Sequence, residues 1–75
     1  MKDNSENKLD MMFLQYRQGK VYKTVIDHTE KELIEKALKR SFGNQSIAAK
    51  LLGINRNTLR AKIGKLKIDA AMYKI

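Results

Sequence analysis

The segment NQSIAAKLLGINRNTLRAKIGKLK, residues 44–67, decides the fold, because it predicts two short helices joined by a glycine turn. Asn44 is of a residue type that caps helix starts with its side-chain oxygen. Next comes an apolar face at helical spacing, formed by Ile47, Ala48, Leu51 and Leu52. Gly53 ends the first helix, because glycine adopts the left-handed conformation without a clash, and Ile54 supplies the apolar contact of such a cap.

A second helix starts at Asn55 in the same way, and its apolar stripe consists of Leu59, Ile63 and Leu66. At about 100° per residue, the opposite face carries the small or polar residues Asn57, Ala61 and Gly64. Arg60 lies to the side of this face, and Arg56 and Lys62 lie on its shoulders. A small residue in the first helix, Ala49, leaves room for the two helices to cross. This arrangement is typical of a helix-turn-helix, whose second helix enters a groove of DNA.

Positive charge is concentrated in the second half of the chain. The net charge is +8, and residues 39–75 hold nine Lys or Arg side chains against one acid, Asp69, whereas residues 1–38 hold seven of each sign. We therefore expect a polyanionic partner, either nucleic acid or an anionic membrane surface. No apolar run exceeds four residues, so we expect no membrane span and no signal peptide. These observations favour nucleic acid and a cytoplasmic location.

With 75 residues, the chain is expected to form one small domain, which buries little surface by itself. The absence of cysteine excludes disulfides and thiolate metal sites, and the single histidine, His28, has no obvious further ligands around it. We therefore expect no metal and no cofactor. Dimerisation is the expected source of additional buried surface.

The N-terminal residues are interpreted as a dimerisation region. Residues 1–7 are polar, and we expect them to be a disordered arm. Lys8 to Gln18 carries a wide apolar stripe, which predicts a short helix ending at Gly19. Because so short a helix is marginal alone, its stripe must be covered by this chain's own core or by a second chain. We favour a dimer interface, formed by Leu9, Met12, Phe13, Tyr16, Val25 and Ile26.

Residues 21–41 predict either one long helix or two segments. Thr29-Glu30-Lys31-Glu32 is a capping-box pattern that would start a new helix at Thr29, and the β-branched pair Val25 and Ile26 adds to this possibility. However, no Gly or Pro interrupts the run. Phe42-Gly43 ends it, and residues 68–75 form a tail that either adds a helical turn or trails off.

The segment GNQSIAAKLLGINRNTLRAKI, residues 43–63, closely resembles the C-terminal helix-turn-helix of the factor for inversion stimulation (Fis) and of the NtrC-type enhancer-binding activators, which act with the nitrogen-type sigma factor. The resemblance implies an all-α, four-helix bacterial domain that ends in a helix-turn-helix over residues 43–67. It further implies a homodimer through the helices of residues 8–42, which binds double-stranded DNA with helix 55–67 in the major groove of a pseudo-palindromic site. It also favours one continuous helix over residues 21–41.

The resemblance assigns DNA contacts by position. The groove residues would be Asn55, Arg56, Thr58 and Arg60, and the residues near the phosphates would be Asn44, Gln45, Ser46 and Lys62. We add Lys50 and Lys65, which are flexible charges at the rim. Ala61 stands where Fis has a lysine, which removes a contact, and Asn57 replaces a glycine and is an expected additional contact.

Catalysis finds no support in the sequence, because no nucleophile–base pair, carboxylate pair or phosphate-binding glycine loop can be built from these residues. Two binding functions are open. One is a DNA-binding dimer, either the detached domain of an NtrC-type activator or a free-standing, DNA-bending Fis-like nucleoid protein. The other is a basic helical module that binds an acidic protein or RNA. We favour the activator, because the N-terminal arm is too short for the β-hairpin region that resemblance to Fis would require. Any contact with RNA polymerase would then be made by domains outside this chain.

Overall fold

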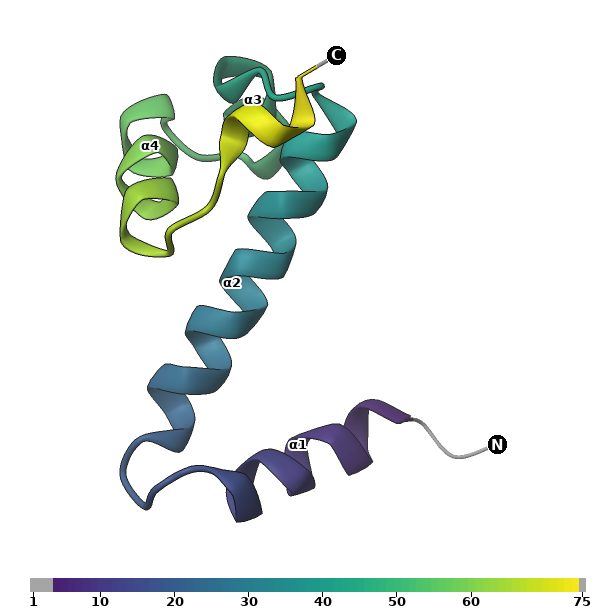
Figure 1. The fold of residues 1–75 in the computed structure, drawn as a ribbon, viewed down its shortest axis with the longest axis vertical. Helices are drawn as coiled ribbons and strands as arrows, with labels where there is room; N and C mark the ends of the chain where they lie inside the picture. Colours follow the sequence, from purple (N-terminus) through teal and green to yellow (C-terminus); the bar gives the residue numbers. More distant parts are fainter. Residues whose placement is uncertain (1–3, 75) are drawn as a thin grey trace.

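The computed structural model describes residues 4–74, with side chains from residue 8 onward. In this range the chain forms four α-helices, one short 3-10 helix and no strand, which confirms the all-α, four-helix prediction (Figure 1). The helices are α1 (Asn4–Gln15), α2 (Val21–Arg40), α3 (Gln45–Leu52), α4 (Arg56–Lys65) and η1 (Ala70–Tyr73).

Helix α1 begins and ends earlier than the sequence predicts. Residues 1–3 of the expected disordered arm lie outside the described residues, and residues 4–7 form the start of α1. The helix ends at Gln15 instead of Gln18, and a turn with Gly19 at φ +85° leads into α2.

Helix α2 is one continuous helix of 20 residues, so the capping-box pattern at Thr29 does not start a new helix. Side chains four residues apart support the middle of this helix. Lys23 donates a hydrogen bond of 2.9 Å to Asp27, and His28 Nε2 lies 2.9 Å from Glu32 Oε1. Such pairs support a helix weakly, because both side chains remain accessible to water.

Three helices end with the same left-handed turn. The left-handed residues are Phe42 (φ 54°), Gly53 (φ 72°) and Lys67 (φ 55°). In each turn the next amide donates to a carbonyl five residues earlier, in the pairs Gly43 to Leu38, Ile54 to Ala49 and Ile68 to Ile63. These are the bonds of a Schellman cap, as predicted for Gly53. After α2, by contrast, the first left-handed residue is Phe42, and Gly43 (φ 80°) continues the turn.

The buried cluster that forms the hydrophobic core begins at Ile34 and includes no residue of α1. It is built from the end of α2, from α3 and α4, and from the segment after α4, through Ile34, Ala37, Leu38, Ala48, Ala49, Leu59, Ile63 and Ile68. Helix α1 contacts α2 and stands apart from this core (Figure 1). Of the α1 side chains from residue 8 onward, only Met12 is buried.

The buried face of α3 differs from the predicted one. Ala48 and Ala49 are buried and Leu52 is half-buried, whereas Ile47 and Leu51 are exposed. The two alanines explain the rotation, because small side chains let the α3 backbone approach α2 and α4 closely. The face that contains both alanines is therefore turned inward, and the two larger side chains turn outward.

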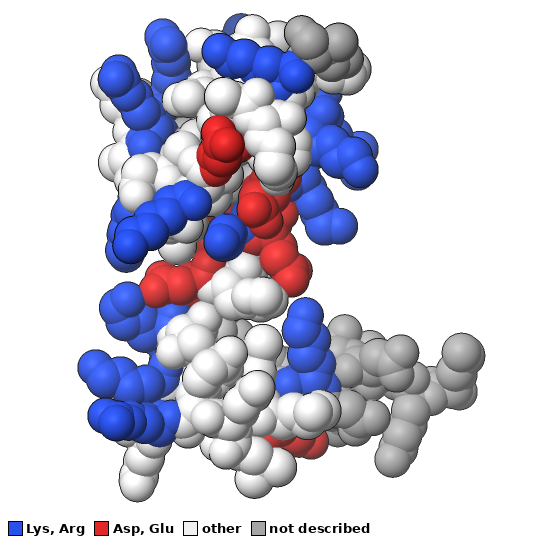
Figure 2. Space-filling view, in the orientation of Figure 1, with Lys and Arg blue, Asp and Glu red and all other residues white. Residues whose placement is uncertain are grey.

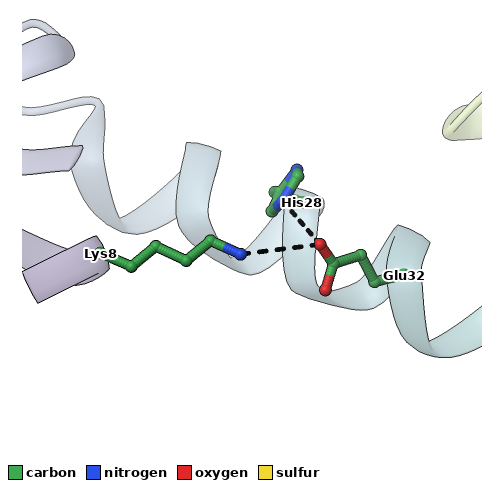
Figure 3. Close-up of polar contacts among 3 residues, drawn as sticks. All are labelled: Lys8, His28 and Glu32. Carbon is green, nitrogen blue, oxygen red and sulfur yellow. Dashed lines mark ion pairs between the residues drawn. The ribbon is translucent and has the colours of Figure 1, made fainter. Parts of the chain in front are cut away.

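Among the side chains described from residue 8 onward, one polar cluster connects α1 to α2 (Figure 3). Glu32 Oε1 lies 3.8 Å from Lys8 Nζ of α1 and 2.9 Å from His28 Nε2 of α2. All three side chains are about half exposed, so solvent screens these pairs and each contributes little. The position of α1 is thus weakly fixed within one chain.

Candidate nucleic-acid interface

The predicted helix-turn-helix is present, with both predicted caps. Asn44 Oδ1 accepts a hydrogen bond of 3.1 Å from the Ile47 amide at the start of α3. Asn55 Oδ1 accepts one of 2.7 Å from the Asn57 amide at the start of α4. Because each cap replaces a hydrogen bond that the helix itself cannot make, the two starts are fixed by their own sequences.

Helix α4 presents its expected face to solvent. Leu59 and Ile63 are buried, which holds the opposite side of the helix outward. The exposed residues of this helix are Arg56, Asn57, Thr58, Arg60, Ala61, Gly64 and Lys65. The centre of the face carries only the small residues Ala61 and Gly64, so a bulky partner can approach the backbone there. Arginine and polar side chains surround that centre.

An open hollow of about 850 Å³ separates the starts of α3 and α4. Its lining comprises Phe42, Gly43, Asn44, Gln45, Ser46, Arg56, Arg60 and Lys74. The structure therefore brings together three of the residues predicted near phosphates with two of the predicted groove arginines. Lys74 belongs to the same hollow, although the sequence analysis did not single it out. Lys50 is exposed on α3 but does not line the hollow.

Charge is segregated over the surface of the molecule. Figure 2 shows Lys and Arg side chains on the flanks of the helix-turn-helix end, and acidic side chains mainly at mid-height of the molecule, with some acidic surface on the front of the helix-turn-helix end. The hydrogen bond from Lys23 lowers the pKa of Asp27 below its usual value, and the positive charges of Lys65 and Lys62 act in the same direction. The end of α4 thus lies near the acids of α2, whereas the hollow has cations and no acid in its lining.

Lys62 is the half-buried cation of α4 and forms an ion pair with α2. Its Nζ donates a hydrogen bond of 2.7 Å to Glu30 Oε2 of α2, and the two side chains are only 35% and 26% exposed. The sequence predicted a phosphate contact here, since Lys62 lies on the shoulder of the exposed face. In the structure this ammonium group is paired with a carboxylate 32 residues away, and its contact with a phosphate stays a prediction. Lys62 therefore fastens α4 to α2.

Replacing Lys62 by Ala is expected to lower the free energy of unfolding by about 1 kcal/mol, because it breaks a partly buried ion pair. Glu30→Gln should have a similar effect, and the double variant should cost less than the sum of the two. Lys65→Ala removes an exposed charge from the same helix and should leave stability unchanged. Urea unfolding of the four variants measures these differences. If Lys62→Ala left stability intact and weakened DNA binding as much as Lys65→Ala, Lys62 would bind a phosphate and would not stabilise the fold.

The six residues predicted to form a dimer interface are largely uncovered in the single chain. Met12 is buried, and Tyr16 and Val25 are half-buried. Leu9, Phe13 and Ile26 are exposed, at 47%, 67% and 45%. Further apolar side chains extend this exposed area along α1 and α2, namely Met11, Leu14, Tyr22 and Leu33. Leu33 is thus exposed although it lies next to Ile34, which is buried in the core.

The described residues offer neither a cluster of metal ligands nor a helix that could span a membrane. No group of three or more His, Asp or Glu side chains there is arranged to hold a metal ion. None of the helices there is long and apolar enough to cross a bilayer.

Comparison with known proteins gives consistent results. The profile of the bacterial regulatory proteins of the Fis family matches residues 26–66. The chain is 49% identical over 49 residues, 65% of its length, to the DNA-binding transcriptional regulator NtrC of Azospirillum brasilense, of which the match covers 10%. It is 49% identical over 43 residues, 57% of its length, to a protein of Ralstonia nicotianae named as Fis-like and DNA-binding, of which the match covers 56%. No solved structure matches the chain significantly.

Proposed function

The chain belongs to the Fis family of bacterial regulatory proteins, and from this membership we propose that it is the sequence-specific DNA-binding domain of an NtrC-type transcriptional activator and acts as a homodimer. The family membership and the helix-turn-helix make it a DNA-binding domain. Homodimerisation, sequence specificity and the place in an activator are the proposed steps. The chain spans about a tenth of the NtrC protein that it matches.

The observation that carries the proposal is the exposed face of α4. Arg56 and Arg60 stand on this face beside a centre of Ala61 and Gly64, and residues 42–68 contain no acid that would repel phosphate. In a helix-turn-helix, the start of the second helix contacts base edges while the first helix crosses the backbone. Arginine suits the first role, because its guanidinium binds both acceptors of a guanine edge.

The proposal of a dimer is supported by the exposed apolar side chains of α1 and α2. The core involves only residues 34–73, so α1 and the first half of α2 have no core of their own within one chain. A two-fold dimer through these helices would cover the exposed patch and pair the α4 helices. The DNA site would then be a pseudo-palindrome with one half-site for each α4.

A binding titration tests the function. Duplexes selected from a random pool by the full chain are compared with scrambled duplexes, by fluorescence anisotropy at physiological salt. A specific domain should prefer the selected duplex by about 10³-fold or more. Equal affinity for both duplexes would leave only electrostatic binding and would contradict sequence-specific recognition. Tighter binding to an acidic peptide or to RNA than to any duplex would favour an interaction module instead.

A free-standing Fis-like protein is the second candidate, and the match to the Ralstonia protein favours it. The gene context separates the two. An ATPase domain encoded in frame before this segment would support the activator, and an immediate start codon would support the free-standing protein.

A further inference from the structure

The segment after α4 has a fixed place, although it lies beyond the residues that the Fis family profile matches. Lys67 turns the chain with φ 55°, and the Ile68 amide donates to the Ile63 carbonyl. Ile68 is buried in the core, and Ala70 and Tyr73 pack against it. Figure 1 shows the result, with η1 lying across the C-terminal end of α2.

Gly43 determines how closely this segment approaches the start of α3. A Cβ atom at residue 43 would lie 3.1 Å from both the Ala70 carbonyl oxygen and the Lys74 amide nitrogen, and 2.8 Å from Lys74 Cγ. These contacts are too tight for a side chain, and φ 80° is also a conformation that favours glycine. The absence of a side chain at Gly43 therefore allows Lys74 to sit directly beside the turn before α3.

Lys74 joins the two arginines of the candidate interface at this place. It is exposed and lines the same hollow as Arg56 and Arg60, together with the first residues of α3. None of the ion pairs found among residues 8–74 involves these three cations. Three positive charges from α4 and from the end of the chain thus face one open space with no acid in its lining.

We propose that residues 67–74 are a second DNA-contacting element, in which Lys74 binds a phosphate of the strand that borders the major groove holding α4. This inference rests on the proposed function, since it assumes that α4 enters DNA. The position of Lys74 decides between phosphate and base. Lys74 lies beside the start of α3, and in this motif α3 is the helix that crosses the DNA backbone. Its ammonium group is a flexible point charge, without the planar fork by which arginine recognises bases.

The test is a salt series with Lys74→Ala on the selected and the scrambled duplex. Loss of one phosphate contact per subunit lowers the slope of log K against log salt by about 0.9 per subunit. At 0.15 M salt this corresponds to about a fivefold loss of affinity per contact. Both duplexes should weaken by the same factor, because a phosphate contact carries no sequence information. Lys74→Arg keeps the charge and should retain affinity and slope.

Lys20→Ala is the matched control, because it removes the same charge from the turn at the other end of α2 (Figure 1). Twenty helical residues, about 30 Å, separate that turn from the hollow. Equal slopes for Lys74→Ala and Lys20→Ala, with wild-type binding intact, would overturn this inference and leave the proposed function standing. A wild-type chain that bound no duplex would instead refute the proposed function. Thermal unfolding followed by circular dichroism checks that the variants remain folded.

Discussion

Replacing Phe13 by Asp is expected to leave the protein monomeric. Phe13 is 67% exposed in the single chain, so the new carboxylate stays in water when the chain folds alone. In a dimer through α1 and α2 the same carboxylate would be buried without a partner, at a cost of several kcal/mol. A small interface that is held mainly by apolar side chains does not offset such a cost.

DNA binding should fall with dimerisation. In a dimer, once one α4 helix has bound its half-site, the second α4 is held close to the other half-site. This high effective concentration raises the affinity for the full site by about 10²–10⁴-fold. Phe13→Asp should therefore lose about this factor on the full site and change little on a single half-site. Sedimentation of the free protein and titration of both duplexes measure the two effects.

Gln15→Asp is the control for Phe13→Asp, because it adds the same charge two positions along α1, on another side of the helix. It should remain dimeric. A wild-type chain that sedimented as a monomer at roughly tens of micromolar would refute the dimer, since a functional dimer should form in that range. Equal dissociation of both variants would mean that net charge, and not the apolar patch, controls assembly.

Both ends of α3 and the start of α4 could be predicted from the sequence because their causes are local. The Asn44 and Asn55 side chains bond to amides two or three residues away, and Gly53 supplies a left-handed turn that few other residues adopt readily. The single helix over residues 21–40 followed from the lack of Gly or Pro and from the family resemblance. A capping-box pattern alone did not decide it, since such a pattern is also compatible with a helix interior.

The buried face of α3 could not be predicted, because eight residues with five apolar side chains offer more than one stripe. Packing chose the stripe with Ala48 and Ala49, where close approach is possible, over Ile47 and Leu51. The pairing of Lys62 with Glu30 joins residues 32 positions apart, and the position of Lys74 depends on Gly43. Neither has a local sequence signal. The helices of the candidate interface could thus be predicted from the sequence, whereas its contacts between distant residues could not.

Arg60→Lys is expected to reduce sequence discrimination while keeping most of the non-specific affinity. Arg60 is exposed on α4 and lines the hollow beside Arg56. Its guanidinium can bind both acceptors of a guanine edge, which is worth about 1–3 kcal/mol at each half-site. Lysine preserves the charge, and therefore the attraction to phosphates, but it lacks the planar fork. The ratio of affinities for the selected and scrambled duplexes should then fall by about fivefold or more for each half-site.

The measurement is a salt series on both duplexes with Arg60→Lys, Arg60→Ala and Lys65→Ala. Lys65 is exposed near the end of α4, and its loss should weaken both duplexes equally and lower the salt slope. Arg60→Lys should leave the salt slope unchanged, because the charge is retained, and should weaken only the selected duplex. Arg60→Ala should show both effects together. If Arg60→Lys kept full discrimination while Lys65→Ala lost it, base recognition would lie at the end of α4 and not at its start.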